Sequence, residues 1–200
     1  MSFQALGLDA HILKAIQEYG YTEPTPIQAA AIPPIIAGHD LIGIAQTGTG
    51  KTAAFTLPIL TRLAAGPKTP GTKVLILAPT RELVVQIEEN VLAYAKHLPL
   101  SIAKVFGGVG ERPQIEALRR GCDIVIATPG RLIDLMDQRY GNFSGLQHLV
   151  LDEADRMLDM GFLPGIKRII KALPRKRQTL MFSATLSKEI EALTHEFQHH

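Results

Sequence analysis

The chain has 200 residues, of which 46% are hydrophobic and 20% are charged, and its formal net charge is +2. This length suits one domain with its own core, and the balance of apolar and charged residues excludes an intrinsically disordered chain. The single cysteine excludes an internal disulfide and a thiolate metal cluster. No apolar run approaches the roughly 18 residues that a membrane span needs. Because the first residues also carry no secretory signal pattern, we expect a cytoplasmic protein that does not contact a membrane.

Two helices are expected near the N-terminus. Residues 11–19 carry apolar side chains at helical spacing and are followed by Gly20, a residue that commonly ends helices. A second helix is expected over residues 26–31, where Pro33 and Pro34 should disturb or end it.

Short apolar segments then alternate with segments of helical period. The expected strands are residues 41–45, 73–78, 102–106, 123–127, 148–152 and 178–183. The expected helices are residues 51–63, 81–96, 113–120, 129–136, 163–173 and 187–197, the last with Ser187 as its N-cap. Near-continuous apolar strands that alternate with helices predict an α/β fold, in which a parallel sheet is covered by helices on both faces.

A loop with the features of a phosphate-binding site follows the first predicted strand. The loop and the start of the next helix are Ala45, Gln46, Thr47, Gly48, Thr49, Gly50, Lys51 and Thr52. Glycines let backbone N–H groups turn toward an anion, and the helix N-terminus adds partial positive charge. Lys51 would reach the terminal phosphates and Thr52 would ligate magnesium. The alternative is a strand-to-helix turn that binds nothing, and the common pattern has glycine where this chain has Ala45.

Acidic residues stand where the apolar run 148–152 ends. Asp152 is placed to hold magnesium, usually through water, and Glu153 is placed to orient or deprotonate an attacking water. Such a pair alone often only caps the next helix. Downstream of a phosphate loop, the pair indicates nucleoside triphosphate chemistry.

The segment Asp152-Glu153-Ala154-Asp155 resembles the signature of the DEAD-box RNA helicases, and other motifs of that family occur in the family's order. The segments that resemble the adenine-reading Q motif, motif Ia, the glycine doublet, motif Ib and motif III are residues 20–28, 79–83, 107–108, 128–131 and 183–185. The resemblance covers nearly the whole chain. It implies the first RecA-like P-loop NTPase domain of such a helicase, of bacterial type, over residues 1–200, with a Q-motif helical part over residues 1–36.

The Q motif implies that ATP is the nucleotide. The amide of Gln28 offers a donor and an acceptor side by side, which match the N6 and N7 edge of adenine. Tyr21 or Phe3 would stack on the base. For Phe3 a plain hydrophobic anchor against the first helix is an equal alternative.

By resemblance, three loops grip the sugar-phosphate backbone of RNA without reading its bases. The residues expected to contact RNA are Pro79, Thr80, Arg81, Gly107, Gly108, Thr128, Gly130 and Arg131. From the residues alone, helix capping and surface arginines remain the alternative. Asp155, Ser183 and Thr185 would couple the nucleotide state to strand separation, with an ordinary turn as the alternative.

DEAD-box helicases have two RecA-like domains, and this chain resembles the first. The second supplies an arginine finger, a group worth roughly 10³ to 10⁵ in rate. We therefore expect a monomeric fragment that binds ATP, magnesium and RNA and is nearly inactive alone. Once joined to its second domain, it would unwind RNA with Lys51, Asp152 and Glu153 as catalytic residues. Two alternatives stay open: an ATP-dependent clamp that holds RNA, and a P-loop ATPase that acts on DNA or without nucleic acid.

The remaining unusual residues have simple interpretations. Cys122 is expected to be a small buried or half-buried side chain and not a nucleophile. The basic residues at 167–168 and 175–177 are expected to form a solvated face. The C-terminal histidines, His195, His199 and His200, have no partner ligands in the sequence, so no metal is expected there.

Overall fold

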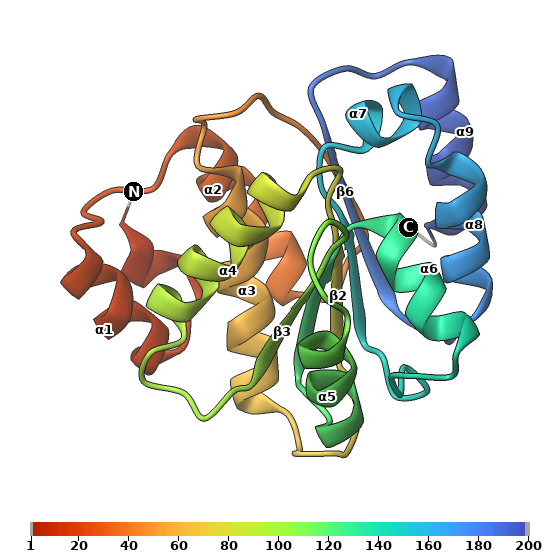
Figure 1. Ribbon diagram of the computed structural model, residues 1–200. Coiled ribbons are helices and arrows are strands. Elements are labelled where there is room, and N and C mark those ends of the chain that lie inside the picture. The colour runs from red at the N-terminus through yellow and green to blue at the C-terminus, as the bar shows by residue number, and fades with distance from the viewer. Residues whose placement is uncertain (1, 199–200) are drawn as a thin grey trace.

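The computed structural model describes residues 2–198, and their strands form a six-stranded sheet in the order β1-β6-β5-β2-β4-β3 (Figure 1). Every pairing in the sheet is parallel. The strands are β1 (Leu41–Ile44), β2 (Val74–Leu77), β3 (Ile102–Val105), β4 (Ile124–Ala127), β5 (His148–Leu151) and β6 (Gln178–Ser183). All six strands fall inside the segments expected from the sequence, and the predicted α/β class is confirmed.

Helices cover both faces of the sheet, as predicted. The elements η1 (Phe3–Leu6), α1 (Ala10–Tyr19), α2 (Pro26–Ile36), α3 (Lys51–Ala65) and α4 (Arg81–Tyr94) pack on one face. The elements on the other face are α5 (Arg112–Arg120), α6 (Pro129–Asp137), α7 (Ala154–Asp159), α8 (Leu163–Lys171) and α9 (Lys188–Phe197). Within residues 2–198, no helix combines the length and the apolar character that a bilayer crossing requires.

The two cores follow from the alternation of side chains along each strand. In β2, Val74 and Ile76 belong to the core beneath α1–α4, while Leu75 and Leu77 belong to the core beneath α5–α9. All four side chains are buried. A strand that is buried on both faces needs apolar residues at every position, which is why these strands read as unbroken apolar runs.

Two helix ends behave as the sequence indicates. Gly20 ends α1 with a φ of 104°, and its N–H reaches the carbonyls of Ile16 and Gln17. Ser187 caps α9, because its hydroxyl accepts a hydrogen bond from the N–H of Ile190. Both predictions are confirmed.

The prolines Pro33 and Pro34 were expected to disturb or end the second helix; they do not end it, because α2 continues through both to Ile36. Two prolines remove two donors from the helix ladder. The helix is nevertheless stabilised, because Ile32 and Ile35 are completely buried in the core beneath α1–α4. Tertiary packing therefore outweighs the local preference of proline. The elements η1 and α7 were not predicted; both are too short to carry a clear helical period.

Gly43 in β1 leaves space for the ring of Phe182 in β6, so we expect Gly43→Ala to destabilise the fold. A Cβ at this position would lie 2.6 Å from two ring carbons, in a buried contact that also includes Phe55. Overpacking of this kind costs about 1–3 kcal/mol. Chemical denaturation should therefore show a lower unfolding free energy.

The matched control is Gly145→Ala, where the added Cβ has only an ordinary contact at 3.8 Å. Equal unfolding free energies for the two variants would contradict this account of Gly43.

Candidate functional site

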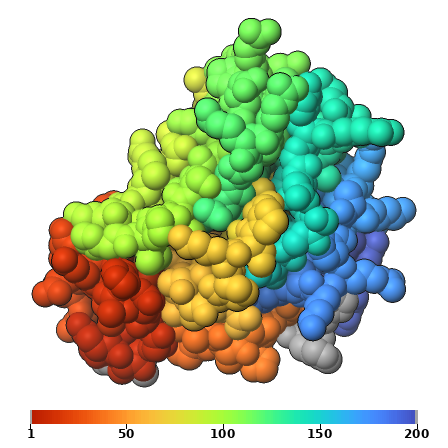
Figure 2. Space-filling view, turned by 90° about the horizontal axis from the view of Figure 1, so that it is seen from below, coloured from red at the N-terminus to blue at the C-terminus, as the bar shows by residue number. Residues whose placement is uncertain are grey.

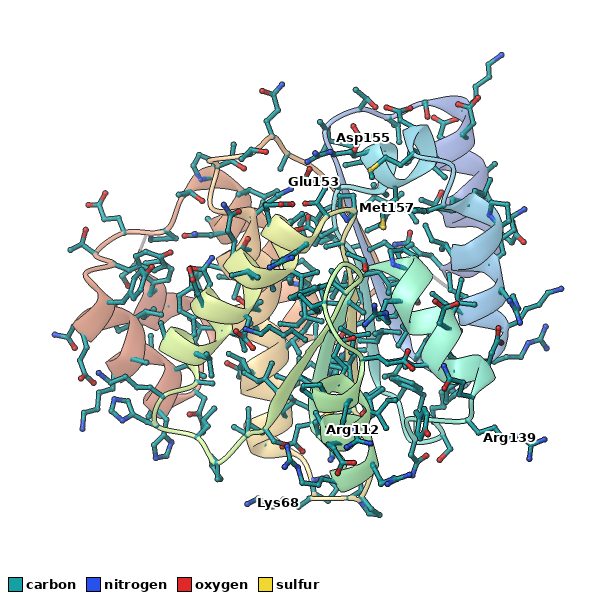
Figure 3. All side chains as sticks on the ribbon, viewed as in Figure 1. Lys68, Arg112, Arg139, Glu153, Asp155 and Met157 are labelled. Carbon is teal, nitrogen blue, oxygen red and sulfur yellow. The ribbon has the colours of Figure 1, made fainter. Side chains whose placement is uncertain are left out.

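The residues predicted to carry chemistry gather at the carboxyl ends of the strands. The strands β1, β5 and β6 are neighbours in the sheet, so the segments that follow them leave the same edge together. Figure 3 shows Glu153 and Asp155 at this end of the molecule, with Lys68 and Arg139 at the opposite end. Ligands of open parallel sheets bind beyond the carboxyl ends of the strands.

The predicted phosphate loop adopts a conformation that needs its glycines. Gly48 and Gly50 have φ angles of 88° and 82°, in the region that side chains disfavour. Gly50 is also the N-cap of α3, and a Cβ there would lie 2.5 Å from Nε2 of Gln28. The start of the loop is fixed to the sheet, because the N–H of Ala45 donates to the carbonyl of Ser183 at 2.9 Å. The exposed part of the loop is Gln46, Thr47, Gly48 and Thr49, and it is followed by the partly buried Thr52.

Lys51, the first residue of α3, reaches the acidic pair after β5. Its Nζ lies 3.1 Å from Oδ1 of Asp152 and 3.1 Å from Oε2 of Glu153. The side chains of Lys51 and Asp152 are 6% and 0% exposed. The structure therefore brings together the three residues predicted to be catalytic, although Lys51 stands about a hundred positions before the two acids in the chain.

The carboxylate of Asp152 is buried with the ammonium of Lys51 as its main partner. Within the described part of the chain, neither of its oxygens has a partner in hydrogen-bonding geometry, although Lys51 lies within ion-pair distance. Burial raises the pKa of this carboxyl, and the ammonium of Lys51 opposes the rise. Buried carboxylate oxygens without partners are costly in a protein. Their position and hard oxygen chemistry fit a divalent cation such as magnesium.

Glu153 has a strained backbone that directs its side chain toward Lys51. Its φ and ψ are 53° and 52°, a left-handed conformation that non-glycine residues seldom adopt. It stands at the N-cap of α7 but makes no capping hydrogen bond there. The alternative in which this acid only caps the next helix is therefore not what the structure shows. Strain of this kind is concentrated at functional sites.

Gln28 lies buried at the start of α2, directly against the phosphate loop. Its Oε1 accepts a hydrogen bond from the N–H of Thr25, and its Nε2 donates to the carbonyl of Gly50 at 3.1 Å. The hydroxyl of Thr25 accepts from the N–H of Gln28, which completes a capping box. An amide has two donors and two acceptor lone pairs, so one of each remains.

Phe3 and Tyr21 belong to an aromatic cluster beside α1. Their ring centroids are 6.1 Å apart with nearly parallel planes, and the hydroxyl of Tyr21 lies 2.7 Å from that of Tyr94. Phe3 is only 2% exposed, in the same core as Ile16. This packing favours the interpretation of Phe3 as a hydrophobic anchor. Burial and the bond to Tyr21 raise the pKa of Tyr94.

A pocket of about 710 Å³ lies between the phosphate loop and α2. Its volume is in the range of small-molecule sites, about 300–1,000 Å³. The lining residues include Thr25, Ile27, Ala30, Gln46, Thr49 and Ala184. Phe3 and Tyr21 instead line a smaller pocket of about 220 Å³. The structure therefore places these two rings apart from the pocket beside the phosphate loop.

The residues predicted to couple the site to strand separation form a short chain of contacts. The hydroxyl of Ser183 donates to the carbonyl of Thr185 at 2.7 Å, and the hydroxyl of Thr185 lies 3.5 Å from Oδ2 of Asp155. Ser183 also holds the start of the phosphate loop through its own carbonyl. Strand β6 thus connects the phosphate loop with the acidic segment.

The three loops predicted to contact RNA follow the neighbouring strands β2, β4 and β3. Arg81 joins two of them: its Cζ lies 5.2 Å from the ring centroid of Phe106, and a Cβ on Gly108 would stand 3.8 Å from its Nη1. A Cβ added at Gly107 or Gly130 meets nothing within 4 Å, so both glycine backbones are open to approach. The structure brings the predicted residues of these loops to one edge.

The capping alternative holds for one of the two threonines in these loops. The hydroxyl of Thr80, which follows the buried Pro79, accepts a hydrogen bond from the N–H of Leu83 and caps α4. Thr128 stands at the N-cap of α6 but makes no capping bond with its side chain. The first turn of α6 therefore keeps backbone donors without a helical partner, a common site for phosphate oxygens.

One residue of this region was missed in the sequence. Gln114 on α5 is 6% exposed and forms hydrogen bonds with Phe106 and Arg131. A signal was present, because Gln114 stands four residues before the buried Leu118 and therefore on the same helix face. A polar side chain on an apolar face needs partners.

The predictions for the remaining residues have mixed outcomes. Cys122 is buried as predicted, and burial raises the pKa of its thiol. In the basic face, Lys167 and Arg168 form ion pairs with Glu196 and Asp137. Arg177 is half-buried and donates to Thr179 and to the carbonyls of Pro174 and Phe197, so it is structural and not part of a solvated face. His195 lies in the last turn of α9; His199 and His200 are outside the described residues.

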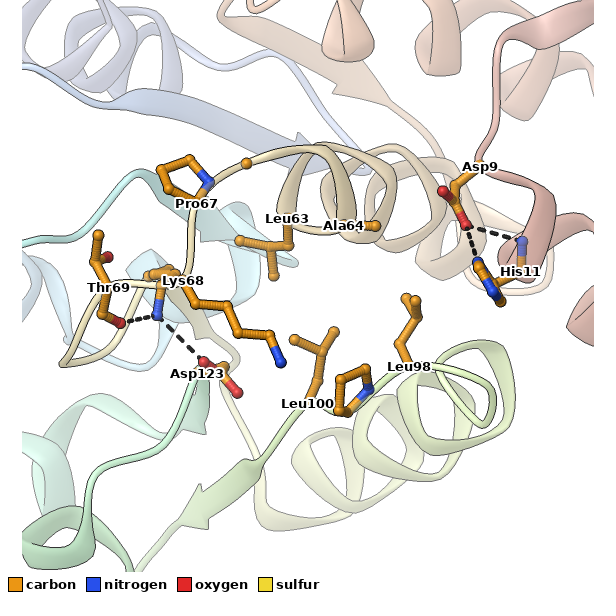
Figure 4. A pocket seen from close by; sticks show the side chains of 13 residues that line it. Asp9, His11, Leu63, Ala64, Pro67, Lys68, Thr69, Leu98, Leu100 and Asp123 are labelled. Atoms are coloured by element: carbon orange, nitrogen blue, oxygen red, sulfur yellow. Dashed lines mark hydrogen bonds and ion pairs between the residues drawn. The ribbon is translucent and has the colours of Figure 1, made fainter.

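A second pocket, of about 400 Å³, opens at the opposite end of the sheet (Figures 2 and 4). It is formed where the segment after α3, the segment before β3 and the start of α1 meet. Two of its ionic groups pair with each other, because Lys73 contacts Asp123 at 3.2 Å. Asp9 likewise accepts a hydrogen bond from the backbone N–H of His11. The polar groups that line this pocket are therefore largely paired with other groups of the protein, whereas the carboxylate of Asp152 is not hydrogen-bonded.

Comparisons with known proteins agree with this geometry. A family model described as DEAD/DEAH box helicase matches residues 25–193. The chain is 50% identical over 198 residues to DEAD-box ATP-dependent RNA helicase 30 of Arabidopsis thaliana, a match that covers 98% of this chain and 34% of that protein. It is 44% identical over 197 residues to ATP-dependent RNA helicase DeaD of Buchnera aphidicola, covering 98% of this chain and 32% of that protein. The chain thus spans about a third of the length of these curated relatives.

Proposed function

The chain belongs to the DEAD/DEAH box helicase family, and on this premise we propose that it is the ATP-binding and RNA-contacting domain of an ATP-dependent RNA helicase. The observation that carries the proposal is the buried contact of Lys51 with Asp152 and Glu153 beside a glycine-rich loop. The proposed domain covers residues 1–200, with residues 1–36 as its Q-motif helical part. In the whole protein, ATP binding and hydrolysis would drive local unwinding of an RNA duplex.

The proposed nucleotide site uses the groups at the carboxyl ends of β1 and β5. Lys51 would contact the terminal phosphates, and the backbone of the phosphate loop would surround them. Thr52 and Asp152 would hold magnesium, largely through water. When bound, magnesium would neutralise charge on the phosphates during transfer. Glu153 would orient the attacking water and accept its proton.

The proposed RNA contacts use backbone donors and two arginines, Arg81 and Arg131. The N–H groups of the first turn of α6, the open backbone at Gly107 and the guanidinium of Arg81 lie along one edge of the sheet. Phosphate oxygens accept hydrogen bonds from such groups whatever the base sequence. This supports recognition of the RNA backbone without base reading. The contact between Thr185 and Asp155 is the proposed connection between this edge and the nucleotide site.

The proposal includes a second RecA-like domain in the natural protein. Relatives about three times as long as this chain support it. An arginine finger from that domain would account for roughly 10³ to 10⁵ in rate. We therefore predict that the isolated domain hydrolyses ATP barely or not at all. Its monomeric state, its cytoplasmic location and its bacterial type also stay predictions.

Gln28→Ala is expected to remove the preference for adenine. The free donor and acceptor of the Gln28 amide match adenine, and a bidentate base contact is worth about 1–3 kcal/mol. Calorimetric titration of the chain with ADP, ATP and GTP in magnesium should show adenine-selective binding. In the variant, the affinity for ADP and ATP should fall about tenfold to hundredfold, and the affinity for GTP should fall less, since GTP loses only the support that the bond of Gln28 to Gly50 gives the phosphate loop.

The matched control is Gln138→Ala, which removes an exposed glutamine just after α6; among the described residues, its side chain bonds only the carbonyl of Asp134 in that helix. Equal affinities for ATP and GTP in the unmodified chain would exclude the base-reading role of Gln28. If none of the three nucleotides bound, the nucleotide site itself would be in error.

A further inference from the structure

The side chain of Gln114 joins two of the loops proposed to contact RNA. Its Nε2 donates to the carbonyl of Phe106, in the loop after β3, at 2.9 Å. Its Oε1 accepts a hydrogen bond from Nη1 of Arg131, in the first turn of α6, at 3.1 Å. The residue is 6% exposed. Both ends of one buried amide are therefore occupied by different loops.

Arg131 completes the connection with its second nitrogen. Its Nη2 donates to the carbonyl of Val109 at 3.0 Å. The loop between β3 and α5 is thus held at two carbonyls, Phe106 and Val109, that flank the glycine doublet. The guanidinium of Arg81 also lies over the ring of Phe106.

The glycine doublet needs such support. Gly108 has a φ of 82°, and Gly107 has no neighbour within 4 Å of an added Cβ. Glycine loses more conformational freedom on ordering than any other residue. A loop that must order itself on binding loses affinity, and a loop that is already ordered does not. The bonds of Gln114 and Arg131 fix the segment on either side of the two glycines.

Gln114 is also well suited to this task by its chemistry. A glutamine amide carries a donor and an acceptor, so it can bond a carbonyl and an arginine at the same time. An apolar residue would leave both partners unsatisfied, and a carboxylate would serve only the arginine. The buried side chains of α5 are those of Gln114 and Leu118, so this amide is a main attachment of the helix.

We infer that Gln114 is a positioning residue for RNA binding, which holds the glycine loop and Arg131 in the arrangement that receives the RNA backbone. The inference rests on the proposed function, since it assigns a support to the proposed RNA contacts. Gln114 itself lies beneath the loops and does not touch the nucleic acid. Its loss should weaken RNA binding and leave the nucleotide site, at the end of β1 and β5, unaffected.

The test compares three variants of the natural protein that carries this sequence. Gln114→Met keeps the size and removes both bonds, while Gln114→Glu keeps an acceptor for Arg131 and loses the donor to Phe106. The control, Gln138→Met, changes an exposed glutamine of the next turn after α6. The measurements are ATP affinity by calorimetry, ATPase rate against the concentration of a single-stranded poly(U) RNA, and the melting temperature.

We expect Gln114→Met to raise the RNA concentration for half-maximal ATPase stimulation about tenfold. The rate at saturating RNA and the ATP affinity should stay within twofold of the unmodified protein. Gln114→Glu should have an intermediate effect, and the control none. A lower melting temperature with unchanged RNA dependence would overturn the inference in favour of a structural role, and so would a parallel loss of ATP and RNA affinity.

Failure of the proposed function would look different. An unmodified protein whose ATPase rate does not respond to poly(U) would overturn the proposed RNA-dependent activity, and with it the assignment of Gln114 to RNA binding. An unmodified protein that responds, together with a Gln114→Met variant that responds identically, would overturn only the role of Gln114.

Discussion

Lys51→Ala is expected to abolish detectable ATP binding. Its ammonium lies 3.1 Å from a carboxylate oxygen of Asp152 and 3.1 Å from one of Glu153. Among residues 2–198, no other ion pair brings one positive charge to both acids. Without it, the phosphates of ATP would face two carboxylates opposed only by magnesium and by Arg156, which lies 3.5 Å from Glu153. We expect no heat of binding for ATP by calorimetry at concentrations that saturate the unmodified chain.

The same substitution should also lower the stability of the fold. Asp152 is completely buried, and Lys51 is the partner that opposes its desolvation. Removing one member of a buried ion pair costs about 3–5 kcal/mol. Chemical denaturation should therefore show this loss, and the double variant Lys51→Ala/Asp152→Asn should recover much of it, because no buried charge is left unpaired. ATP binding should stay absent in both.

Lys73→Ala is the matched control for these measurements. Lys73 is also a buried lysine, 8% exposed, and pairs with Asp123 at 3.2 Å, but it precedes β2 and so lies at the opposite end of the sheet. It should lose stability and keep ATP affinity. Normal ATP binding by Lys51→Ala would remove this lysine from the nucleotide site.

Glu153→Gln is expected to lower RNA-stimulated ATP hydrolysis in the natural protein by about 10² to 10⁴. Lys51 donates a hydrogen bond to Oε2 of Glu153 at 3.1 Å in the unmodified chain. The amide oxygen of a glutamine can accept the same bond, so the local arrangement should persist. It can no longer take a proton from water. Affinities for ATP and RNA should therefore stay close to those of the unmodified protein, while steady-state phosphate release falls.

Asp152→Asn tests the proposed magnesium ligand, in contrast to the proposed base Glu153. The buried carboxylate of Asp152 is the proposed magnesium ligand, so this variant should lose the part of ATP affinity that depends on magnesium. Titrations in magnesium and in a chelator separate the two roles. Undiminished hydrolysis by Glu153→Gln would show that another group activates the water.

Local patterns in the sequence were sufficient to predict where the strands of the sheet lie. The four inner strands are short, largely apolar segments that are buried at every position, whereas the edge strands β1 and β3 keep exposed positions; both kinds of strand can be recognised from consecutive residues. The order of the strands is not local, because β2 stands between β5 and β4 through crossovers that no short segment encodes. Pro33 and Pro34 show the same limit: the burial that keeps α2 intact comes from packing against other helices.

The candidate site divides in the same way. Lys51, Asp152 and Glu153 could be predicted because a glycine-rich loop after one apolar strand and an acidic pair after another occur in the same chain. The contacts of Gln114 could not, because they depend on the loop after β3 lying beside the loop after β4. The conformation of Phe3 was equally hidden: an aromatic residue near the N-terminus can stack on a ligand or pack in a core, and only the fold decides.

The pairing of β1 with β6 has a consequence for synthesis on the ribosome. The phosphate loop extends from β1, yet the strand that orders β1 is formed by residues 178–183, near the end of the domain. While the intervening residues emerge, β1 is an unpaired apolar edge and its loop has no anchor at Ser183. We therefore expect the nascent chain to complete the proposed nucleotide site last, after β6 has left the exit tunnel, and β1 to be the strand most exposed to chaperones and to misfolding until then.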